Sequence, residues 1–147
     1  MKRSWASANR CWPALRITRF AIGVREPLEH IRRIGPSRYS STRSRLVVHQ
    51  GVATTVATAT EKSNSVYEQA RDALANIDQQ LGEAGTDKRH VLFVTIYLSD
   101  INNKSEFNRA WDEWVDSAEL PLRACVGIEL ESDDLVELVV TAAMPQP

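Results

Sequence analysis

Two apolar runs of strand character follow one another in the middle of the chain. LVVH, over residues 46–49, is separated by Gln50-Gly51 from VATTVATAT, over residues 52–60. Two such runs around a glycine predict a pair of strands joined by a tight turn, because Gly51 adopts positive φ at low cost. The second run is rich in Thr and Ala. That composition favours either an edge strand or a strand that another backbone approaches closely.

Helical spacing of apolar residues begins after residue 65. Ser65 and Glu68 match a capping box, which marks the start of a helix. Gly82 and Gly85 offer its end, and Gly85 is the better C-terminal cap. One apolar stripe at helical spacing lies between these signals. It consists of Val66, Ala70, Ala73, Leu74, Ile77 and Leu81.

The second half of the chain repeats the alternation of strand and helix. VLFVTIYL, over residues 91–98, is almost continuously apolar, which predicts a strand covered on both faces. A second helix is expected after Asn103, which can cap it together with Glu106. Pro121 then opens the first of two final strands. The buried stripe of this second helix is expected to be Phe107, Trp111, Trp114 and Val115.

The predicted order of elements is β-β-α-β-α-β-β, with a hairpin at each end. This order indicates an α+β fold in which two helices pack on one face of a single mixed sheet. The chain has no further element to cover the opposite face of the sheet. We therefore expect a second copy of the chain to cover it, which predicts a homo-oligomer.

Length, cysteine content and hydropathy narrow the class of protein. A chain of 147 residues fits one domain with a core of its own. Its two cysteines, Cys11 and Cys125, have no CxxC spacing, which argues against a zinc site or a disulfide framework and fits a reducing compartment. No apolar run approaches the length of a membrane span. We expect a soluble, cytoplasmic protein with no membrane partner and no metal.

Charge is divided unevenly along the chain. Residues 1–45 carry eleven Lys or Arg and two Glu, whereas residues 46–147 carry seven Lys or Arg and seventeen Asp or Glu. The acidic part argues against a nucleic-acid partner, because Lys and Arg supply most of the affinity for phosphates. Residues 1–30 are interpreted as a basic extension to a domain over residues 31–147. The extension is a disordered tail, a product of a start codon placed too far upstream, or a transit peptide to an organellar matrix.

The first of the two final strands carries an arginine. Arg123 shares one strand face with Cys125 and Gly127, whereas the alternate residues, from Ala124 to Leu130, are expected to belong to the core. Two interpretations of Arg123 are open. It either pairs with an acid such as Glu129 at an interface, or it binds a ligand.

The last strand carries a glutamate among apolar residues. Glu137 lies in LVELVV, where a buried carboxylate needs a partner or a raised pKa. It either forms a salt bridge, within the chain or to a neighbouring one, or it has a chemical role. A hairpin with an even loop would place Glu137 beside Ile128, on the face opposite Arg123. An odd loop or a bulge would bring Glu137 to the side of Arg123, and a catalytic role requires such an irregularity.

Four segments in their order and spacing resemble the RidA/YjgF family, and within it the branch with a tryptophan-rich second helix. They are ANIDQQLGEAGTDKRHVLFVTIYLSD, FNRAWDEWV, LPLRACV and LVELVVTAA. The resemblance covers roughly residues 34–144. It implies a chorismate-mutase-like α+β fold and a homotrimer with ligand clefts between subunits. It also implies hydrolysis of enamines and imines, such as 2-aminoacrylate, to 2-keto acids and ammonia without a cofactor.

The resemblance assigns roles by position. Arg123 would hold the substrate carboxylate, since a guanidinium offers the parallel donors that a carboxylate accepts. Glu137 would orient the attacking water. Cys125 lacks a clear general base, so we expect it to line the pocket rather than act as a nucleophile. Asn108 either lines the site or ties a loop.

The chain departs from the family pattern at several positions. Val56 and Ala57 stand where the family has Ser-Gly or Thr-Gly, so a hydroxyl is lost and a methyl is expected to narrow the cleft. Lys104 replaces a common Phe. Tyr39 is the candidate for an aromatic near the N-terminus, with an apparent insertion around it. The Val56-Ala57 pair favours an alternative function, a non-catalytic protein that binds small carboxylates. The acidic domain, without a His/Lys cluster, argues against an endoribonuclease.

Overall fold

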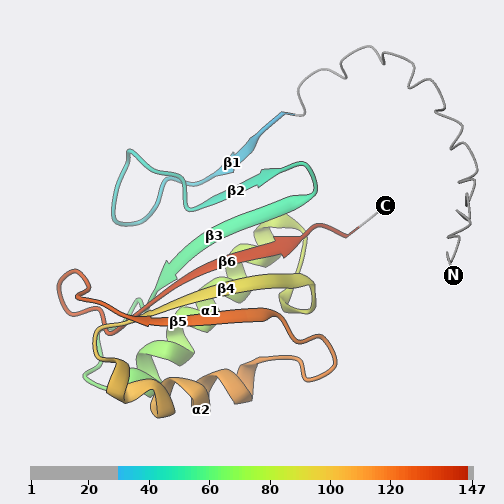
Figure 1. Ribbon diagram of the computed structural model, residues 1–147. Coiled ribbons are helices and arrows are strands. Elements are labelled where there is room, and N and C mark those ends of the chain that lie inside the picture. Colours follow the sequence, from blue (N-terminus) through green and yellow to red (C-terminus); the bar gives the residue numbers. More distant parts are fainter. Residues whose placement is uncertain (1–29, 146–147) are drawn as a thin grey trace, which may run out of the picture.

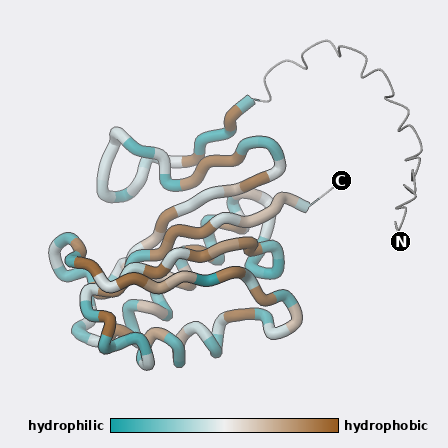
Figure 2. Tube along the Cα trace, viewed as in Figure 1, coloured by the Kyte–Doolittle hydropathy of each residue, from teal (hydrophilic) through white to brown (hydrophobic). Residues whose placement is uncertain are grey.

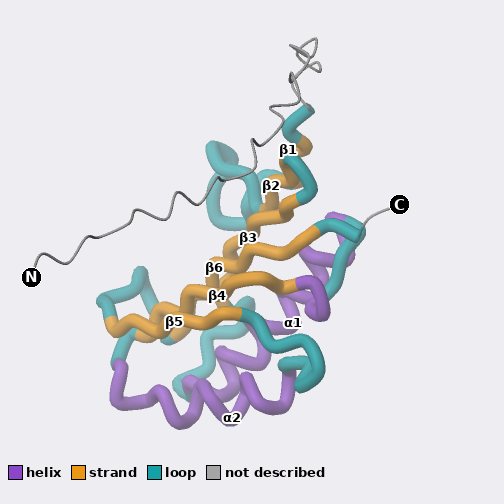
Figure 3. The backbone as a smooth tube through the Cα atoms, turned by 45° about the vertical axis from the view of Figure 1, so that its right-hand side comes forward, coloured by secondary structure: helices purple, strands orange, loops and turns teal. Residues whose placement is uncertain are grey.

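A computed structural model describes residues 30–145, so the interpretation of the basic extension lies almost wholly outside the described residues. The described chain forms one six-stranded sheet with two helices on one of its faces, as Figures 1 and 3 show. The sheet order is β1-β2-β3-β6-β4-β5. The elements are β1 (Arg32–Ile34), β2 (Leu46–His49), β3 (Val52–Thr58), α1 (Val66–Ala84), β4 (Val91–Leu98), α2 (Lys104–Trp114), β5 (Leu122–Gly127) and β6 (Val136–Ala143).

The first hairpin forms as predicted. Gln50 and Gly51 both adopt positive φ, of 48° and 74°, and His49 pairs with Val52. The edge interpretation of residues 52–60 is wrong, because β3 lies between β2 and β6. One edge is instead β1, which pattern reasoning missed since it has only three residues and two of them are arginines.

The first helix also follows its sequence signals. Ser65 Oγ accepts a hydrogen bond from the backbone N–H of Glu68 at 3.3 Å, and Gly85 closes the helix at φ 94°. All six residues of the predicted stripe are buried. The second helix buries Phe107, Trp111 and Trp114 as expected, whereas Val115 follows the end of the helix and is only partly buried.

Asn103 is the N-cap residue of the second helix, as predicted, but its side chain makes no capping hydrogen bond. A short 3₁₀ turn, Ile101–Asn103, precedes α2, and Asp100 caps that turn by accepting from the backbone N–H of Asn102 at 2.9 Å. The turn already satisfies backbone donors at the start of α2, so the capping side chain is that of Asp100, at the start of the turn.

The predicted C-terminal hairpin is wrong. β5 pairs with β4 in parallel and forms an edge of the sheet, whereas β6 is antiparallel to both β3 and β4 and lies between them. The reason is the helix between β4 and β5: a crossover through α2 returns the chain parallel to β4. Residues 128–135, hereafter the acidic loop, then carry the chain past β4 to β6. The loop-parity argument for Glu137 therefore does not apply.

The two faces of the sheet differ in their surroundings. The face under α1 and α2 holds the core, to which β4 and β6 contribute Val94, Ile96, Leu98, Val136, Leu138 and Val140. The opposite face, hereafter the open face, carries exposed apolar side chains. They include Val56, Phe93, Leu122 and Val126. Figure 2 shows hydrophobic residues along the strands of the sheet.

The open face corrects two expectations about the core. Val126 is 44% and Ile128 51% exposed, so the face of β5 that was expected in the core is uncovered in a single chain. β4 is likewise covered on one face, since Phe93 is exposed. Both errors have one cause: an apolar face that awaits a second protein surface has the same sequence pattern as a core face.

Candidate functional site

The predicted site residues fall into two groups in one chain. The first group lies around a cleft of about 520 Å³, bounded by residues 35–45 (the arginine-rich loop), the end of β3, the middle of α1, the acidic loop and the start of β6. Tyr39, Val56, Ala57 and Glu137 all line this cleft. The second group is Arg123, Cys125 and Asn108, on β5 and α2, and none of the three is among the residues that line the cleft.

Glu137 reaches the cleft from the open face of the sheet. It lies between two register partners, Thr58 on β3 and Tyr97 on β4. Its side chain is partly buried and, within residues 30–145, makes no hydrogen bond or ion pair. The salt bridge considered from sequence is therefore absent within the described chain, and the carboxyl oxygens are available to other groups.

The surroundings of Glu137 raise its pKa. Partial burial, which disfavours the charged form, is the largest cause, and the negative charges of Asp134 and Glu131 act in the same direction. Arg43 opposes them. A carboxyl with a raised pKa exchanges a proton more readily near neutral pH than an ordinary glutamate does.

Arg123 faces the helix layer at the edge of the sheet. Its register partner on β4 is the buried Val94, and its guanidinium carbon lies 5.1 Å from the centre of the Trp111 ring, a cation–π contact. The side chain is exposed, and no described residue, Glu129 included, forms an ion pair with it. The guanidinium donors are free for a carboxylate from outside the chain.

Arg123 and Glu137 lie on opposite faces of the sheet. Arg123 is in register with Val94 and Val140, which face the helices, whereas Glu137 is in register with Tyr97 and Val126, which face away from them. The pairing of β4 with β6 has one irregularity, between Val91 and Phe93, and it lies outside the regular register that relates the two residues. A single chain therefore does not bring the two side chains to the same face of the sheet.

Cys125 and Asn108 share the helix-covered side with Arg123. Cys125 is register partner to Ile96 and packs against the core. Burial raises the pKa of its thiol, and the nearby charges of Lys104 and Arg123 only partly oppose this. The thiol is therefore protonated at neutral pH, which supports a lining role. The Asn108 Oδ1 is buried and accepts no hydrogen bond from the described residues.

The side chains of Val56 and Ala57, the two departures from the family pattern, lie on opposite faces of the sheet. Val56 projects from the open face opposite Val139, where its side chain is 46% exposed. Ala57 is buried opposite Leu138, and its methyl belongs to the core under the helices. Val56 thus places an aliphatic surface where the family has a hydroxyl.

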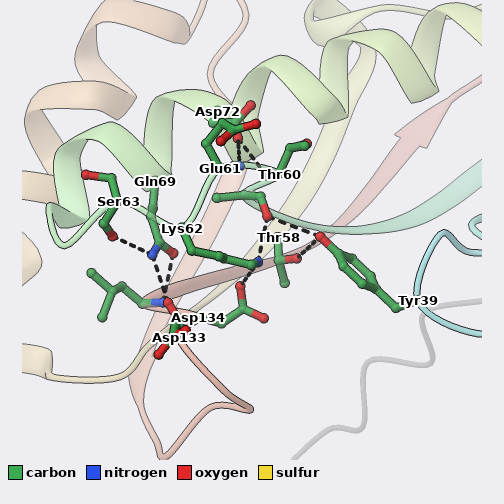
Figure 4. A network of polar contacts seen from close by, with 12 residues as sticks. Tyr39, Thr58, Thr60, Glu61, Lys62, Ser63, Gln69, Asp72, Asp133 and Asp134 are labelled. Carbon is green, nitrogen blue, oxygen red and sulfur yellow. Dashed lines mark hydrogen bonds and ion pairs between the residues drawn. The ribbon is translucent and has the colours of Figure 1, made fainter.

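Tyr39 is brought to the cleft by a set of polar contacts, drawn in Figure 4. Its hydroxyl donates to the carbonyl oxygen of Ala59 at 3.2 Å and accepts from Thr58 Oγ1 at 3.3 Å. The Lys62 ammonium lies 5.4 Å from the centre of its ring. The arginine-rich loop is thereby attached to the end of β3.

Sequence reasoning missed three residues around the cleft. Lys62 forms an ion pair with Asp134, and Gln69 is completely buried and hydrogen-bonded to the acidic loop. Gln69 had a detectable signal, because it is a polar residue that lies among the apolar stripe of the helix at helical spacing. Lys62 and Asp134 had none, since their contact depends on the strand order. Within residues 30–145, no three His, Cys, Asp or Glu side chains are close enough to hold a metal ion.

A family model described as endoribonuclease L-PSP matches residues 34–144, three quarters of the chain. A RutC family protein of Haemophilus ducreyi is 36% identical over 103 residues, which cover 69% of this chain and 88% of that protein. The chain belongs to the RidA/YjgF family. The RutC family protein YoaB of Escherichia coli K12, another relative, is 31% identical over 102 residues, covering 69% of this chain and 90% of its own length.

Solved structures agree with this assignment. NMB1025 of Neisseria meningitidis, a member of the YjgF protein family, is 32% identical, with a TM-score of 0.76 over 82% of this chain and all of that one. Rv2704 of Mycobacterium tuberculosis is 22% identical with a TM-score of 0.69, a likeness of fold over 78% of this chain and all of that one. The mixed sheet with two helices on one face is thus the RidA/YjgF fold. None of the helices that the structure describes is long and apolar enough to cross a membrane.

Proposed function

We propose that this protein hydrolyses reactive 2-imino and 2-enamino acids to 2-keto acids and ammonia, at a site that two neighbouring copies complete within a homotrimer. One observation carries the proposal: Glu137 and Arg123 are both without an ionic partner in the described chain, and they lie on opposite faces of the sheet. The exposed apolar side chains of the open face, which a second copy would cover, give it further support.

The two residues have complementary roles. Arg123 of one copy binds the substrate carboxylate through parallel N–H donors. Glu137 of the adjacent copy, as carboxylate, accepts a hydrogen bond from a water molecule and holds it over the imine carbon. The guanidinium thereby fixes the electrophile, and the carboxylate fixes the nucleophile. Imines react readily with water, so positioning of this kind supplies most of the acceleration.

The proton and electron changes balance without a cofactor. Water oxygen bonds to the carbon of a protonated imine, the π electrons move to nitrogen, and one water proton passes to the Glu137 carboxylate, which gives a neutral carbinolamine. Protonated Glu137 returns that proton to nitrogen. As the C–N bond breaks, the hydroxyl oxygen forms the carbonyl and its proton passes through Glu137 to the departing ammonia, which leaves as ammonium. An enamine enters the same path after it takes up a proton at carbon. The raised pKa of Glu137 suits a group that both accepts and returns a proton.

A second candidate function is a non-catalytic binder of small carboxylates. Val56 favours it, because an exposed aliphatic side chain at the cleft cannot supply the polar contact of a hydroxyl. RNA cleavage, which the description of the family model names, has less support. No histidine is among the residues that line the cleft, and Glu129, Glu131 and Asp134 on its acidic side disfavour a phosphate backbone.

The test measures ammonia and keto acid released from an imino acid that an amino-acid oxidase generates in situ, with semicarbazide as a competing trap. Arg123→Ala and Glu137→Gln are the test variants. Arg71→Ala is the matched control, because Arg71 also lies over an aromatic ring, that of Tyr67, on the outer side of α1. Acceleration lost in both test variants and kept in the control would support the deaminase.

The same proteins separate the two candidate functions. No acceleration by the wild type, together with pyruvate binding that Arg123→Ala abolishes, would favour the binder. In a deaminase, Glu137→Gln should retain pyruvate binding while turnover stops. Neither acceleration nor binding would contradict both functions.

A further inference from the structure

A buried glutamine joins three segments that surround the cleft. Gln69 is 0% exposed, and its Nε2 donates to the carbonyl oxygens of Ser63 at 2.7 Å and Asp133 at 2.9 Å. Its Oε1 accepts from the backbone N–H of Leu135 at 2.9 Å. Both amide hydrogens and the carbonyl oxygen are therefore used, and the acidic loop is fastened to α1 on both sides of Asp134.

Lys62 holds the residue between these two anchor points. Its ammonium forms an ion pair with the Asp134 carboxylate and donates to the carbonyl oxygen of Ala59 at 2.7 Å. The same carbonyl accepts from the Tyr39 hydroxyl. Figure 4 shows the contacts as one network, from the buried amide of Gln69 across the acidic loop to Tyr39.

The network reaches to within two residues of Glu137. Leu135 is bonded on both sides, because its carbonyl oxygen also accepts from the backbone N–H of Ser99 at 3.1 Å. From there β6 runs through the fully buried Val136 to Glu137. A shift of Leu135 would therefore be transmitted along a stiff strand to the carboxyl group.

A polar residue at this position has a cost that hydrogen bonding offsets. Gln69 lies on the buried side of α1, beside Val66 and Ala70, where an apolar side chain would meet no desolvation penalty. The chain instead places there a fully bonded amide whose partners belong to a loop that lines the cleft. Stability alone does not call for that choice.

We propose that Gln69 and Lys62 are positioning residues for Glu137, which act by fixing the acidic loop at Asp133, Asp134 and Leu135. The inference rests on the proposed function, because it assigns Glu137 the task of holding water.

Lys62 has a second effect through charge. The charged groups around Glu137 are Asp134 and Glu131 from the acidic loop and Arg43 from the arginine-rich loop, with Tyr97 beside it on β4. Lys62 offsets the charge of Asp134.

The test compares Gln69→Leu and Lys62→Met with Thr86→Val. Thr86 is the matched control because it too is buried, donating from Oγ1 to the carbonyl oxygen of Ala143 at 2.7 Å, but it follows the far end of α1 and does not line the cleft. Imine hydrolysis is measured well below each variant's melting temperature. We expect Gln69→Leu to lower kcat about 10- to 100-fold with KM nearly unchanged. Thr86→Val should lower the melting temperature and keep kcat.

Two further measurements distinguish a positioning role from an effect on stability alone. Amide exchange at Leu135 should accelerate in Gln69→Leu and stay slow in Thr86→Val. Lys62→Met leaves Asp134 unpaired, which raises the pKa of Glu137 further, so the acid limb of the kcat profile should move to higher pH. Lys62→Arg should restore the limb.

The outcomes that overturn the inference differ from those that overturn the function. An active wild type whose Gln69→Leu variant keeps kcat, or loses activity only through KM, would overturn the positioning role and leave the deaminase in place. An acid limb that Lys62→Met does not move would overturn the role of Lys62. A wild type inactive on every imino acid would overturn the proposed function and this inference with it.

Discussion

Thr58 and Glu137 are direct partners in the antiparallel pairing of β3 with β6, and the Thr58 hydroxyl donates to the phenol oxygen of Tyr39 at 3.3 Å. A strand, a loop and a second strand therefore meet beside the carboxyl group. Thr58 and Tyr39 bear hydroxyl groups, and both residues line the cleft. They place two hydroxyl groups in the cleft that Val56 also lines, and at the position of Val56 the family pattern has a hydroxyl and this chain has none.

This relationship predicts a modest loss of activity in Thr58→Val. The valine keeps the shape of the side chain but removes the donor to Tyr39, so the aromatic ring is held less firmly at the cleft. We expect kcat/KM for imine hydrolysis to fall about 3- to 10-fold, the equivalent of one neutral hydrogen bond. Thr54→Val, on the same face of β3 but outside the cleft lining, is the control. Equal kcat/KM in the two variants would show that the Tyr39 contact is unimportant.

Glu137→Gln is expected to separate activity from stability. Loss of the carboxylate should reduce kcat by about 100-fold or more, the lower range for a general base. Stability should change in the opposite direction. The folded pKa of Glu137 is raised, so its contribution to stability is fully present below the unfolded pKa and is lost as pH rises through the folded pKa.

The measurement is the melting temperature of both proteins across pH. At neutral pH the glutamine variant should melt a few degrees higher than the wild type, and below the unfolded pKa of a glutamate the two should converge. A variant that melts lower at neutral pH would mean that Glu137 is ionically paired in the assembled protein, the alternative left open from the sequence.

Local signals accounted for the helices and the first hairpin. Ser65 and Gly85 bound α1 as their residue types require, and Gln50-Gly51 forms the tight turn. In each case the decisive contacts join residues close in sequence. The missed strand β1 and the absent capping hydrogen bond of Asn103 are also local features, but no distinctive composition marks them.

Strand order could not be obtained in the same way. The pairing of β6 with β3 and β4 joins distant segments, and two adjacent apolar strands are equally compatible with a hairpin. Of the two arrangements left open from the sequence, the one with Glu137 on the face opposite Arg123 is found, but it follows from the position of β4 between β5 and β6 and not from the length of a hairpin loop. Residues such as Lys62, which meet the acidic loop only through that order, were therefore out of reach.

A pair of glycine substitutions tests the packing at the end of β5. A Cβ added at Gly127 would lie 2.8 Å from the Cβ of Ile101, so Gly127→Ala should destabilise the protein by about 1–3 kcal/mol through overpacking. Gly82 is helical, with nothing within 4 Å of its added Cβ, so Gly82→Ala should stabilise by about 0.5–1 kcal/mol. Urea unfolding measures both. The two changes in the free energy of unfolding are expected to have opposite signs. A Gly127→Ala variant as stable as the wild type would mean that the 3₁₀ turn at Ile101 shifts at little cost in free energy.

A charge on the open face tests the proposed homotrimer. Val126 is exposed in one chain and lies in the row that contains Tyr97 and Glu137. If a second copy covers this face, Val126→Asp buries an unpaired carboxylate and should shift a trimer to monomers in light scattering. Ala75→Asp, on the outer side of α1, should leave the mass unchanged. A Val126→Asp protein that stays trimeric would place the interface elsewhere.

Mixing two inactive variants tests whether the site is shared between copies. Arg123→Ala retains Glu137, and Glu137→Gln retains Arg123, so a trimer containing both variants can form an intact site only where the good residue of one copy meets that of its neighbour. In a ring of head-to-tail contacts, random exchange at equal amounts gives about a quarter of the wild-type sites. The two proteins would be unfolded together, refolded and assayed for imine hydrolysis. Activity near that level would establish that Arg123 and Glu137 act across the subunit boundary. Activity no higher than that of the separate variants would mean that both residues must come from one chain. Because the two residues lie on opposite faces of the sheet, they could then not both contact one substrate directly.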